Sequence, residues 1–239
     1  QKRRRGLKLS SLIELNNVNK YYKLKTDSLH VLKSIKFKIE EGDFLIIMGK
    51  SGSGKTTLLN LLGLLDSFDD GEYLLKGQNV IGLNESERST LRNLNMGFIF
   101  QQFHLIDSLT IGQNVELPLL YKGGVSKKER DILVNKYLDL VGLKSKKNRM
   151  PSELSGGQQQ RIAIARAMIN NPSVIFADEP TGALDSETGI EIMGILKKLN
   201  EEKKTIIMVT HDRDLAKYAN KIIMIKDGVA SEVNSNVTN

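Results

Sequence analysis

Residues 49–56 carry the residue types that bind a phosphate chain. They read Gly-Lys-Ser-Gly-Ser-Gly-Lys-Thr and match the pattern G-x-x-x-x-G-K-[ST]. An apolar run, Phe44–Met48, precedes this loop, and Thr57–Leu65 offers a helix behind it. Glycines allow backbone N–H groups to surround phosphate oxygens, and a helix N-terminus adds a favourable dipole. Lys55 is therefore predicted to reach the β- and γ-phosphates of a nucleotide, and the Thr56 hydroxyl to bind Mg²⁺.

A pair of carboxylates follows a second apolar run. Val174–Ala177 is typical of a buried strand, and Asp178 and Glu179 come directly after it. Asp178 is suited to hold Mg²⁺ through water, and Glu179 to polarise an attacking water as general base. Alone, this pattern is also typical of an ordinary boundary between a strand and a turn. Beside the phosphate loop, it predicts hydrolysis of a nucleoside triphosphate.

Residues 154–158 read Leu-Ser-Gly-Gly-Gln and form a third group. Ser155 and Gln158 have the N-cap and N3 spacing of a capping box, with a helix expected over 158–169. Two glycines in the first turn weaken a helix and are expected to add nothing to packing. They make sense if the helix start must approach an anion closely. A capped helix with a purely structural role is the alternative.

The elements that must position these residues alternate between short strands and longer helical patterns. The expected strands are 13–18, 31–39, 44–48, 98–100, 174–177, 205–209 and 222–225. From about 108 to 170 the pattern is helical, with a capping box at Ser126 and Glu129 and an apolar stripe at Ile132, Leu133, Lys136, Tyr137 and Leu140. We expect an α/β fold with a mostly parallel sheet, antiparallel strands near the N-terminus and an all-helical insert.

Composition limits the classes of protein that fit. The 239 residues include no cysteine, which excludes disulfides, thiolate metal sites and a cysteine nucleophile. No apolar run approaches the 18 residues of a membrane span, so a membrane role is expected to go through a partner. The formal net charge is +7, and residues 1–13 supply five of these charges. The net charge of the rest of the chain is ordinary for a soluble domain and predicts no nucleic-acid partner.

The chain is predicted to divide into three parts: a basic tail over 1–11, one catalytic domain over 12–230 with its helical insert at about 102–168, and a polar tail over 231–239. The basic tail has two interpretations. It is either simply solvated, or it contacts anionic lipid. The attraction of anionic lipid for a basic residue near the surface is worth about 1 kcal/mol per residue.

Together these motifs resemble the ATP-binding cassette (ABC) ATPases, whose signature sequence is LSGGQ. The resemblance covers roughly residues 12–229, in the family's order. Gln101 matches the Q-loop glutamine, residues 180–185 match the D-loop, and His211 matches the switch histidine. Tyr22 lies where the family places the aromatic ring that stacks on adenine, although the neighbouring Tyr21 is an alternative. The fold implied is a P-loop (RecA-like) core with an N-terminal antiparallel β-subdomain and a helical insert.

The resemblance also implies a mechanism. Two copies would close head to tail, with each ATP between one copy's phosphate loop and Ser155 and Gly157 of the other. Gln101 would sense Mg²⁺ and the attacking water, His211 would hold the γ-phosphate, and Asp185 would link the two sites. The implied nucleotide contacts are Tyr22, Gly49, Ser51, Gly52, Ser53, Gly54, Lys55, Thr56, Thr57, Ser155, Gly156, Gly157, Gln158 and Asp185, and the implied magnesium ligands are Thr56, Gln101 and Asp178.

A narrower resemblance is to the branch that includes macrolide-exporter and lipoprotein-release ATPases. It is carried by residues 61–66, 97–101, 154–161 and 179–186. It implies an ATPase subunit on the cytoplasmic face of the cell membrane, docked to permease subunits. One alternative is a regulatory ATPase whose membrane partner controls cell-wall hydrolysis. DNA-repair and translation relatives fit less well, because the chain has one cassette and no coiled-coil or zinc insert.

Overall fold

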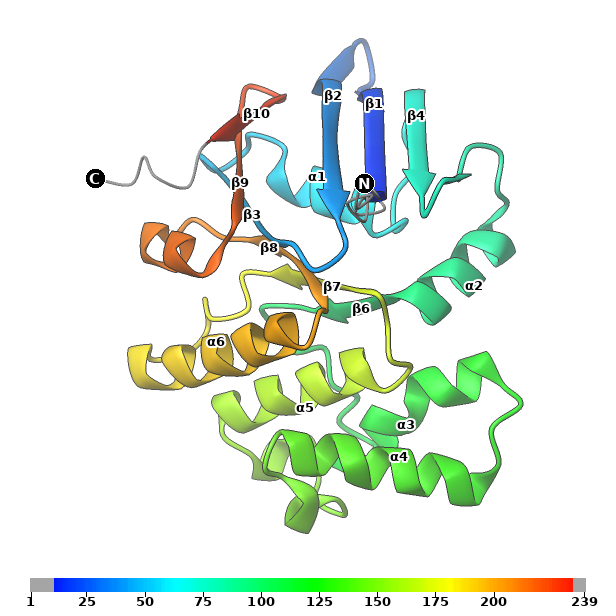
Figure 1. The fold of residues 1–239 in the computed structure, drawn as a ribbon, viewed down its shortest axis with the longest axis vertical. Coiled ribbons are helices and arrows are strands. Elements are labelled where there is room, and N and C mark those ends of the chain that lie inside the picture. Colours follow the sequence, from blue (N-terminus) through cyan, green and yellow to red (C-terminus); the bar gives the residue numbers. More distant parts are fainter. Residues whose placement is uncertain (1–10, 234–239) are drawn as a thin grey trace, which may run out of the picture.

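A six-stranded sheet runs through the middle of the molecule, which the computed structural model describes over residues 11–233 (Figure 1). Its strand order is β10-β9-β3-β8-β7-β6. The strands are β3 (Phe44–Gly49), β6 (Met96–Ile99), β7 (Val174–Asp178), β8 (Thr205–Val209), β9 (Lys221–Lys226) and β10 (Val229–Val233). All neighbours pair in parallel except β10, which is antiparallel to β9. The predicted mostly parallel sheet is confirmed.

The central strands are apolar throughout because both faces of the sheet are covered. Residues 44–48 of β3 are all buried. Ile46 packs in a cluster with α5 (Gly156–Met168), α6 (Ser186–Glu201) and the helical insert. Ile47 packs in a second cluster with α1 (Lys55–Leu62) and the antiparallel sheet. Successive side chains of a strand point to opposite faces, so each central strand joins both layers of the core.

The second sheet is antiparallel and has the order β2-β1-β4-β5. Its strands are β1 (Ser11–Lys23), β2 (Ser28–Glu40), β4 (Asp70–Leu75) and β5 (Gln78–Asn79). The predicted antiparallel strands near the N-terminus are confirmed, but β1 continues five residues past its predicted end at Val18. Register shifts lie on both sides of Val18, and they interrupt the alternation by which a strand is recognised.

The segment between β6 and β7 is helical throughout its described elements. It contains α3 (Ile111–Lys122), α4 (Lys127–Leu140), two 3₁₀ turns (Lys144–Lys146 and Pro151–Glu153) and α5, and α2 (Glu85–Asn95) precedes β6. Ser126 and Glu129 form the predicted capping box. The predicted apolar stripe of α4 is only partly right, because Ile132 and Leu140 are exposed while Val134 and Leu138 are buried. The helix rests on α3 and α5 through the face that carries Val134, Tyr137 and Leu138.

The ends of the described chain adjust the predicted boundaries slightly. Ser11, assigned to the basic tail, begins β1. Residues 231–233, assigned to the polar tail, complete β10, which pairs with β9 along its whole length. The remaining residues of both tails lie outside the described part of the chain. A 3₁₀ segment, Arg213–Tyr218, links β8 to β9. No helix within residues 11–233 combines the length and the apolar character that crossing a bilayer requires.

Candidate nucleotide-binding site

The parallel sheet brings four of the predicted segments together. The phosphate loop follows β3, His211 follows β8, Asp178 ends β7 with Glu179 next, and Gln101 follows β6. These four strands are neighbours in the order β3-β8-β7-β6. Because the carboxyl ends of parallel strands meet at one edge of a sheet, residues up to 162 positions apart in sequence converge there.

The phosphate loop leaves the start of α1 open to an anion. Gly54 is the N-cap of α1 with a φ of 105°, and no side chain caps this helix. Gly52 also has a positive φ, of 77°. A Cβ at Gly49 would lie 2.3 Å from the Ile225 carbonyl oxygen, so only glycine fits there. The Lys55 ammonium donates to the Lys50 carbonyl at 2.9 Å, which folds this cation across the loop. The helix begins two residues earlier than predicted and ends at Leu62.

Asp178 has the electrostatics of a cation ligand. Burial raises the pKa of Asp178, the neighbouring Glu179 carboxylate raises it further, and the Lys55 ammonium opposes both effects. The rise shows that negative charge at this position is only partly compensated by the chain itself. Together with the Thr56 hydroxyl and the Gln101 side-chain carbonyl, Asp178 offers oxygen donors of the kind that Mg²⁺ prefers. These residues fit a magnesium ion.

Glu179 is held in place by the segment that follows β8. Its φ of 45° is unusual for a residue other than glycine, and its backbone N–H donates to the Val209 carbonyl at 3.0 Å. The Thr210 hydroxyl donates to one carboxylate oxygen at 3.2 Å, and the His211 backbone N–H to the other at 3.1 Å. Such backbone conformations cost about 1–3 kcal/mol and cluster at functional sites.

The His211 ring also contacts this carboxylate. Its Nδ1 lies 2.8 Å from Glu179 Oε1. The hydrogen bond to Glu179, with the attraction of its charge, raises the pKa of His211 above the ordinary value. The predicted switch histidine and the predicted general base are therefore paired with each other. Sequence reasoning assigned His211 to the γ-phosphate alone and missed this pairing, which joins residues 32 positions apart.

The signature segment begins α5 as predicted. Ser155 is the N-cap, the Gln158 N–H donates to its hydroxyl at 3.4 Å, and the Gln158 side chain accepts from the Ser155 N–H at 3.3 Å. The helix spans Gly156–Met168, two residues earlier at its start than expected. None of the hydrogen bonds of residues 155–158 within the described chain runs to the phosphate loop.

The expectation that neither glycine serves packing is wrong for Gly157. A Cβ at Gly157 would lie 2.3 Å from Cγ2 of Thr188 on α6. Thr188 has little freedom to move, because both its N–H and its hydroxyl donate to Asp185, at 2.9 and 2.7 Å. At Gly156 an added Cβ would be 3.5 Å from Leu184, an ordinary contact. Gly157 is thus required where α5 crosses α6. Gly156 is not required for that packing, and its lack of a side chain leaves the start of the helix accessible to an anion, as the hypothesis of anion binding requires.

Asp185 and Gln101 flank the two carboxylates. Asp185 is the N-cap of α6, and its hydrogen bonds with Thr188 lower the pKa of its carboxyl. Gln101 is exposed, and its Nε2 would lie 3.0 Å from a Cβ at Gly182, three residues after Glu179. The Gly182 N–H in turn donates to the Glu179 carbonyl at 3.0 Å. The Q-loop glutamine therefore lies beside the turn that begins at Glu179.

Tyr22 and Tyr21 have different surroundings. The Tyr22 hydroxyl donates to Asp66 Oδ2 at 2.7 Å, just beyond the end of α1. The Lys20 ammonium, itself paired with Asp66 at 2.8 Å, lies 5.0 Å from the centre of the Tyr22 ring and covers one face. Tyr21 stacks on His30 with ring centroids 4.1 Å apart. The Tyr22 ring is therefore fixed near the end of the phosphate-loop helix and is partly exposed, whereas the Tyr21 ring is already stacked.

Gln160 is a buried polar residue that sequence reasoning missed. It lies on α5 and is completely buried, and its side-chain amide reaches Pro180 and Phe100. A signal was present in the sequence. Gln160 is three residues after Gly157 and four before Ile164, so all three share the buried face of the helix.

A strand, a glycine loop and a helix carrying Lys55 lie at the same sheet edge as the end of β7, two strands away, where Asp178 and Glu179 are found. This combination defines a phosphate-loop nucleoside triphosphatase. Residues 32–182 match the model of a family described as "ABC transporter". The ABC transporter ATP-binding protein MJ1508 of Methanocaldococcus jannaschii is 52% identical over 222 residues, covering 93% of this chain and 99% of that protein. The chain belongs to the ABC transporter family, and the resemblance seen in the sequence is confirmed.

Two further relatives agree. The macrolide export ATP-binding/permease protein MacB of Neisseria meningitidis serogroup B is 48% identical over 95% of this chain, which spans only 35% of that relative's length. A dimeric structure of the ATP-binding cassette MJ0796 of M. jannaschii, in a post-hydrolysis state bound to ADP and Pi, has a TM-score of 0.86 and 45% identity, covering 94% of this chain and 99% of that one. The chain is an ATP-binding and ATP-hydrolysing cassette.

Proposed function

We propose that two copies of this chain close head to tail around two ATP molecules. Each ATP lies between residues 49–57 of one copy and Ser155–Gln158 of the other. The observation that carries this proposal is the exposed start of α5. Its hydrogen bonds run between Ser155 and Gln158 and not to the phosphate loop of the same copy. A helix N-terminus attracts an anion even where, as here, a capping box satisfies part of its N–H groups, and in this arrangement that anion is the γ-phosphate on the second copy. The dimeric MJ0796 cassette supports the same stoichiometry.

Within each site we assign one role to each residue. Residues Gly49, Ser51, Gly52, Ser53 and Gly54 surround the phosphates through their backbone, Lys55 neutralises the β- and γ-phosphates, and Thr57 lies at the helix start. Tyr22 stacks on the adenine. Thr56, Asp178 and Gln101 would hold Mg²⁺, which would neutralise charge on the phosphate oxygens. Asp185, as the N-cap of α6, positions the turn that faces the second copy.

Glu179 acts as the general base and takes a proton from the attacking water. In the present state its carboxylate is paired with His211, so hydrolysis requires this pair to separate or to widen around a water. The γ-phosphate is a competing anion for His211, because its charge would attract the same ring that now contacts the Glu179 carboxylate at 2.8 Å. Binding of ATP thus provides the force that transfers His211 from Glu179 to the nucleotide and frees the base.

The Glu179→Gln variant tests this assignment. We expect hydrolysis to fall by about 10²–10⁴-fold, because a glutamine amide cannot accept the proton, while ATP-bound dimers accumulate. Turnover and dimer mass are measured on the same sample. Ser155→Arg is the matched variant: it leaves ATP binding to the monomer intact but blocks closure. Normal turnover by Glu179→Gln would remove Glu179 as the base, and loss of monomer binding in Ser155→Arg would contradict the contact between copies.

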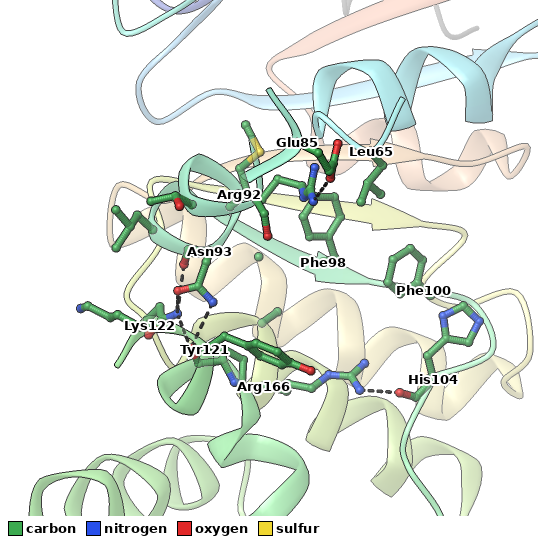
Figure 2. A pocket seen from close by; sticks show the side chains of 18 of the residues that line it. Leu65, Glu85, Arg92, Asn93, Phe98, Phe100, His104, Tyr121, Lys122 and Arg166 are labelled. Carbon is green, nitrogen blue, oxygen red and sulfur yellow. Dashed lines mark hydrogen bonds and ion pairs between the residues drawn. The ribbon is translucent and has the colours of Figure 1, made fainter. Parts of the chain in front are cut away.

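We further propose that the cassette docks permease subunits in a groove between the sheet and the helical insert, on the cytoplasmic face of the cell membrane. This groove is a cavity of about 840 Å³. Figure 2 shows Tyr121 and Arg166 on the insert side and Phe98 and Phe100 on the sheet side. Tyr121 is 84% exposed. The groove therefore combines apolar surface with positive charge.

Arg166 indicates the chemistry of the docked segment. Its guanidinium donates to the backbone carbonyls of Phe103, at 2.7 Å, and of His104. Burial lowers the pKa of Arg166, which shows a desolvated cation. Lys122 and Arg92 also line the groove, and Arg92 is paired with Glu85 at 2.7 Å, so Lys122 and Arg166 provide the positive charge not paired with a carboxylate of the lining. A short amphipathic permease segment with an acidic side chain would complement this surface. The transporter names of the relatives favour this over the regulatory alternative, and nothing in the site calls for nucleic acid.

A further inference from the structure

The side-chain amide of Gln160 joins three segments of the site at one buried point. Its Nε2 donates to the Pro180 carbonyl at 2.5 Å and lies 3.4 Å from the Phe100 carbonyl. The residue is completely buried, and its Oε1 has no hydrogen-bond partner among residues 11–233. Turning the amide over would place Oε1 against two carbonyl oxygens, so the amide is fixed as a donor by its surroundings.

Each partner of this amide is covalently next to a residue of the site. Pro180 directly follows Glu179, and Phe100 directly precedes Gln101. Gln160 lies five residues after Ser155 on the same rigid helix. A displacement of α5 toward or away from the sheet is therefore transmitted through one side chain to both the general base and the Q-loop glutamine.

We propose that Gln160 is a positioning residue that couples the two ATP sites of the dimer. The proposal rests on the head-to-tail arrangement above. In that arrangement Ser155 of one copy contacts the ATP bound to the other copy, whereas Glu179 and Gln101 of the first copy act on its own ATP. Gln160 connects these two groups within one chain. Occupation of one site thereby sets the geometry of the base and the glutamine at the other site, which makes hydrolysis cooperative.

The chain provides a matched control at the next position. Gln159 is also on α5, but its Nε2 donates at 3.2 Å to the Leu154 carbonyl, immediately before its own helix. Gln159→Met removes a glutamine amide without touching Pro180 or Phe100. Gln160→Met keeps the side-chain length and removes both contacts, and Gln160→Glu places a carboxyl oxygen against the two carbonyls.

The experiment measures ATP hydrolysis against ATP concentration for the wild type and the three variants. For Gln160→Met we expect ATP binding within about twofold of the wild type, kcat lower by about tenfold, as for the loss of one or two buried hydrogen bonds, and a Hill coefficient that falls toward one. The kcat of Gln160→Glu should fall further than that of Gln160→Met, and Gln159→Met should match the wild type in kcat and Hill coefficient. A role in folding alone would change the melting temperature but would leave the kcat of the folded protein and its Hill coefficient unchanged.

Three results would overturn the coupling. They are a wild-type Hill coefficient of one, a Gln160→Met variant that matches Gln159→Met in kcat and cooperativity, and a Gln160 side-chain amide resonance that does not shift when Glu179→Gln dimerises with ATP. The last measurement does not depend on the folding of any Gln160 variant. If Glu179→Gln forms no dimer with ATP, the head-to-tail proposal itself fails. If it does dimerise and Gln160→Met behaves as the control, only the coupling is wrong.

Discussion

The contact between Glu179 and His211 makes a contribution to stability that depends on pH. Pairing with Glu179 raises the pKa of His211 above 6.5. A group whose pKa is raised by folding contributes stability that is fully present below its unfolded pKa and is lost as pH rises through its folded pKa. The interaction is worth at most about 1 kcal/mol, because the His211 ring is mostly exposed.

We therefore predict that Glu179→Gln lowers the pKa of His211 toward 6.5, as measured by NMR titration of the ring. The difference in unfolding free energy between the wild type and His211→Gln should be largest near pH 6 and should shrink as pH rises through the folded pKa. A His211 titration that is unaffected by Glu179→Gln would show that the two side chains are not paired in solution.

The surroundings of the two tyrosines predict which one binds adenine. Tyr22→Ala should weaken ATP binding by about five- to a hundredfold, because stacking on a base is worth about 1–3 kcal/mol. Tyr21→Ala is the control and should change the dissociation constant by less than about twofold, since its ring already stacks on His30. Calorimetric titration with ATP measures both. A larger effect at Tyr21 would reverse the assignment.

At the scale of elements, the crossing of α5 over α6 explains why the signature has a glycine at Gly157. It does not explain the glycine at Gly156, for which a functional reason is left. Gly157→Ala should destabilise the protein by about 1–3 kcal/mol, because the new methyl group meets Thr188, which Asp185 holds in place. Gly156→Ala should lie within about 0.5 kcal/mol of the wild type, since alanine favours a helix and has room there. Urea unfolding compares the two variants, and equal effects would contradict this packing argument.

The elements differ in how far the sequence determines them. The buried central strands and the loop at 49–56 were predicted because their signals are contiguous: an apolar run in β3, then glycines in fixed positions. By contrast β4 begins with Asp70 and Gly71, and α2 has no buried residue, so neither showed an apolar period and both were missed. The buried face of α4 was misplaced because its packing against α3 and α5 determines which residues are covered, and the apolar spacing within α4 alone does not show this.

The candidate site divides in the same way. Lys55, Asp178, Glu179 and Ser155 were predicted from local patterns that tie a residue type to a strand end or a helix start. The pairing of Glu179 with His211 and the contacts of Gln160 depend on the order of strands in the sheet. The order of the strands is determined by the packing of the whole core, and local patterns in a single sequence do not predict it.

At the scale of the whole molecule, the sheet edge that carries the phosphate loop and the groove beside the insert use different surfaces. The groove is lined by α2, β6, α3 and α5, and its residues do not include the phosphate loop. Gln101 directly follows Phe100, which lines the groove, so a segment docked there as proposed would lie one residue from Gln101. This adjacency gives a docked permease a short route to the site.

The groove predicts a variant that separates docking from hydrolysis. Tyr121→Asp replaces an exposed ring in the groove with a charge, and we expect copurification with the transmembrane partner from detergent-solubilised membranes to be lost. Ile132→Asp is the matched control, because Ile132 is a 57% exposed apolar residue on α4 outside the groove lining. Hydrolysis by the isolated chain, measured on both variants, verifies that the fold is intact. Removal of an aromatic side chain from the centre of an interface weakens the binding free energy by about 2 kcal/mol or more, which is a loss of roughly thirtyfold in affinity. If the partner remains bound to Tyr121→Asp, or is lost equally from Ile132→Asp, the permease binds elsewhere on the cassette.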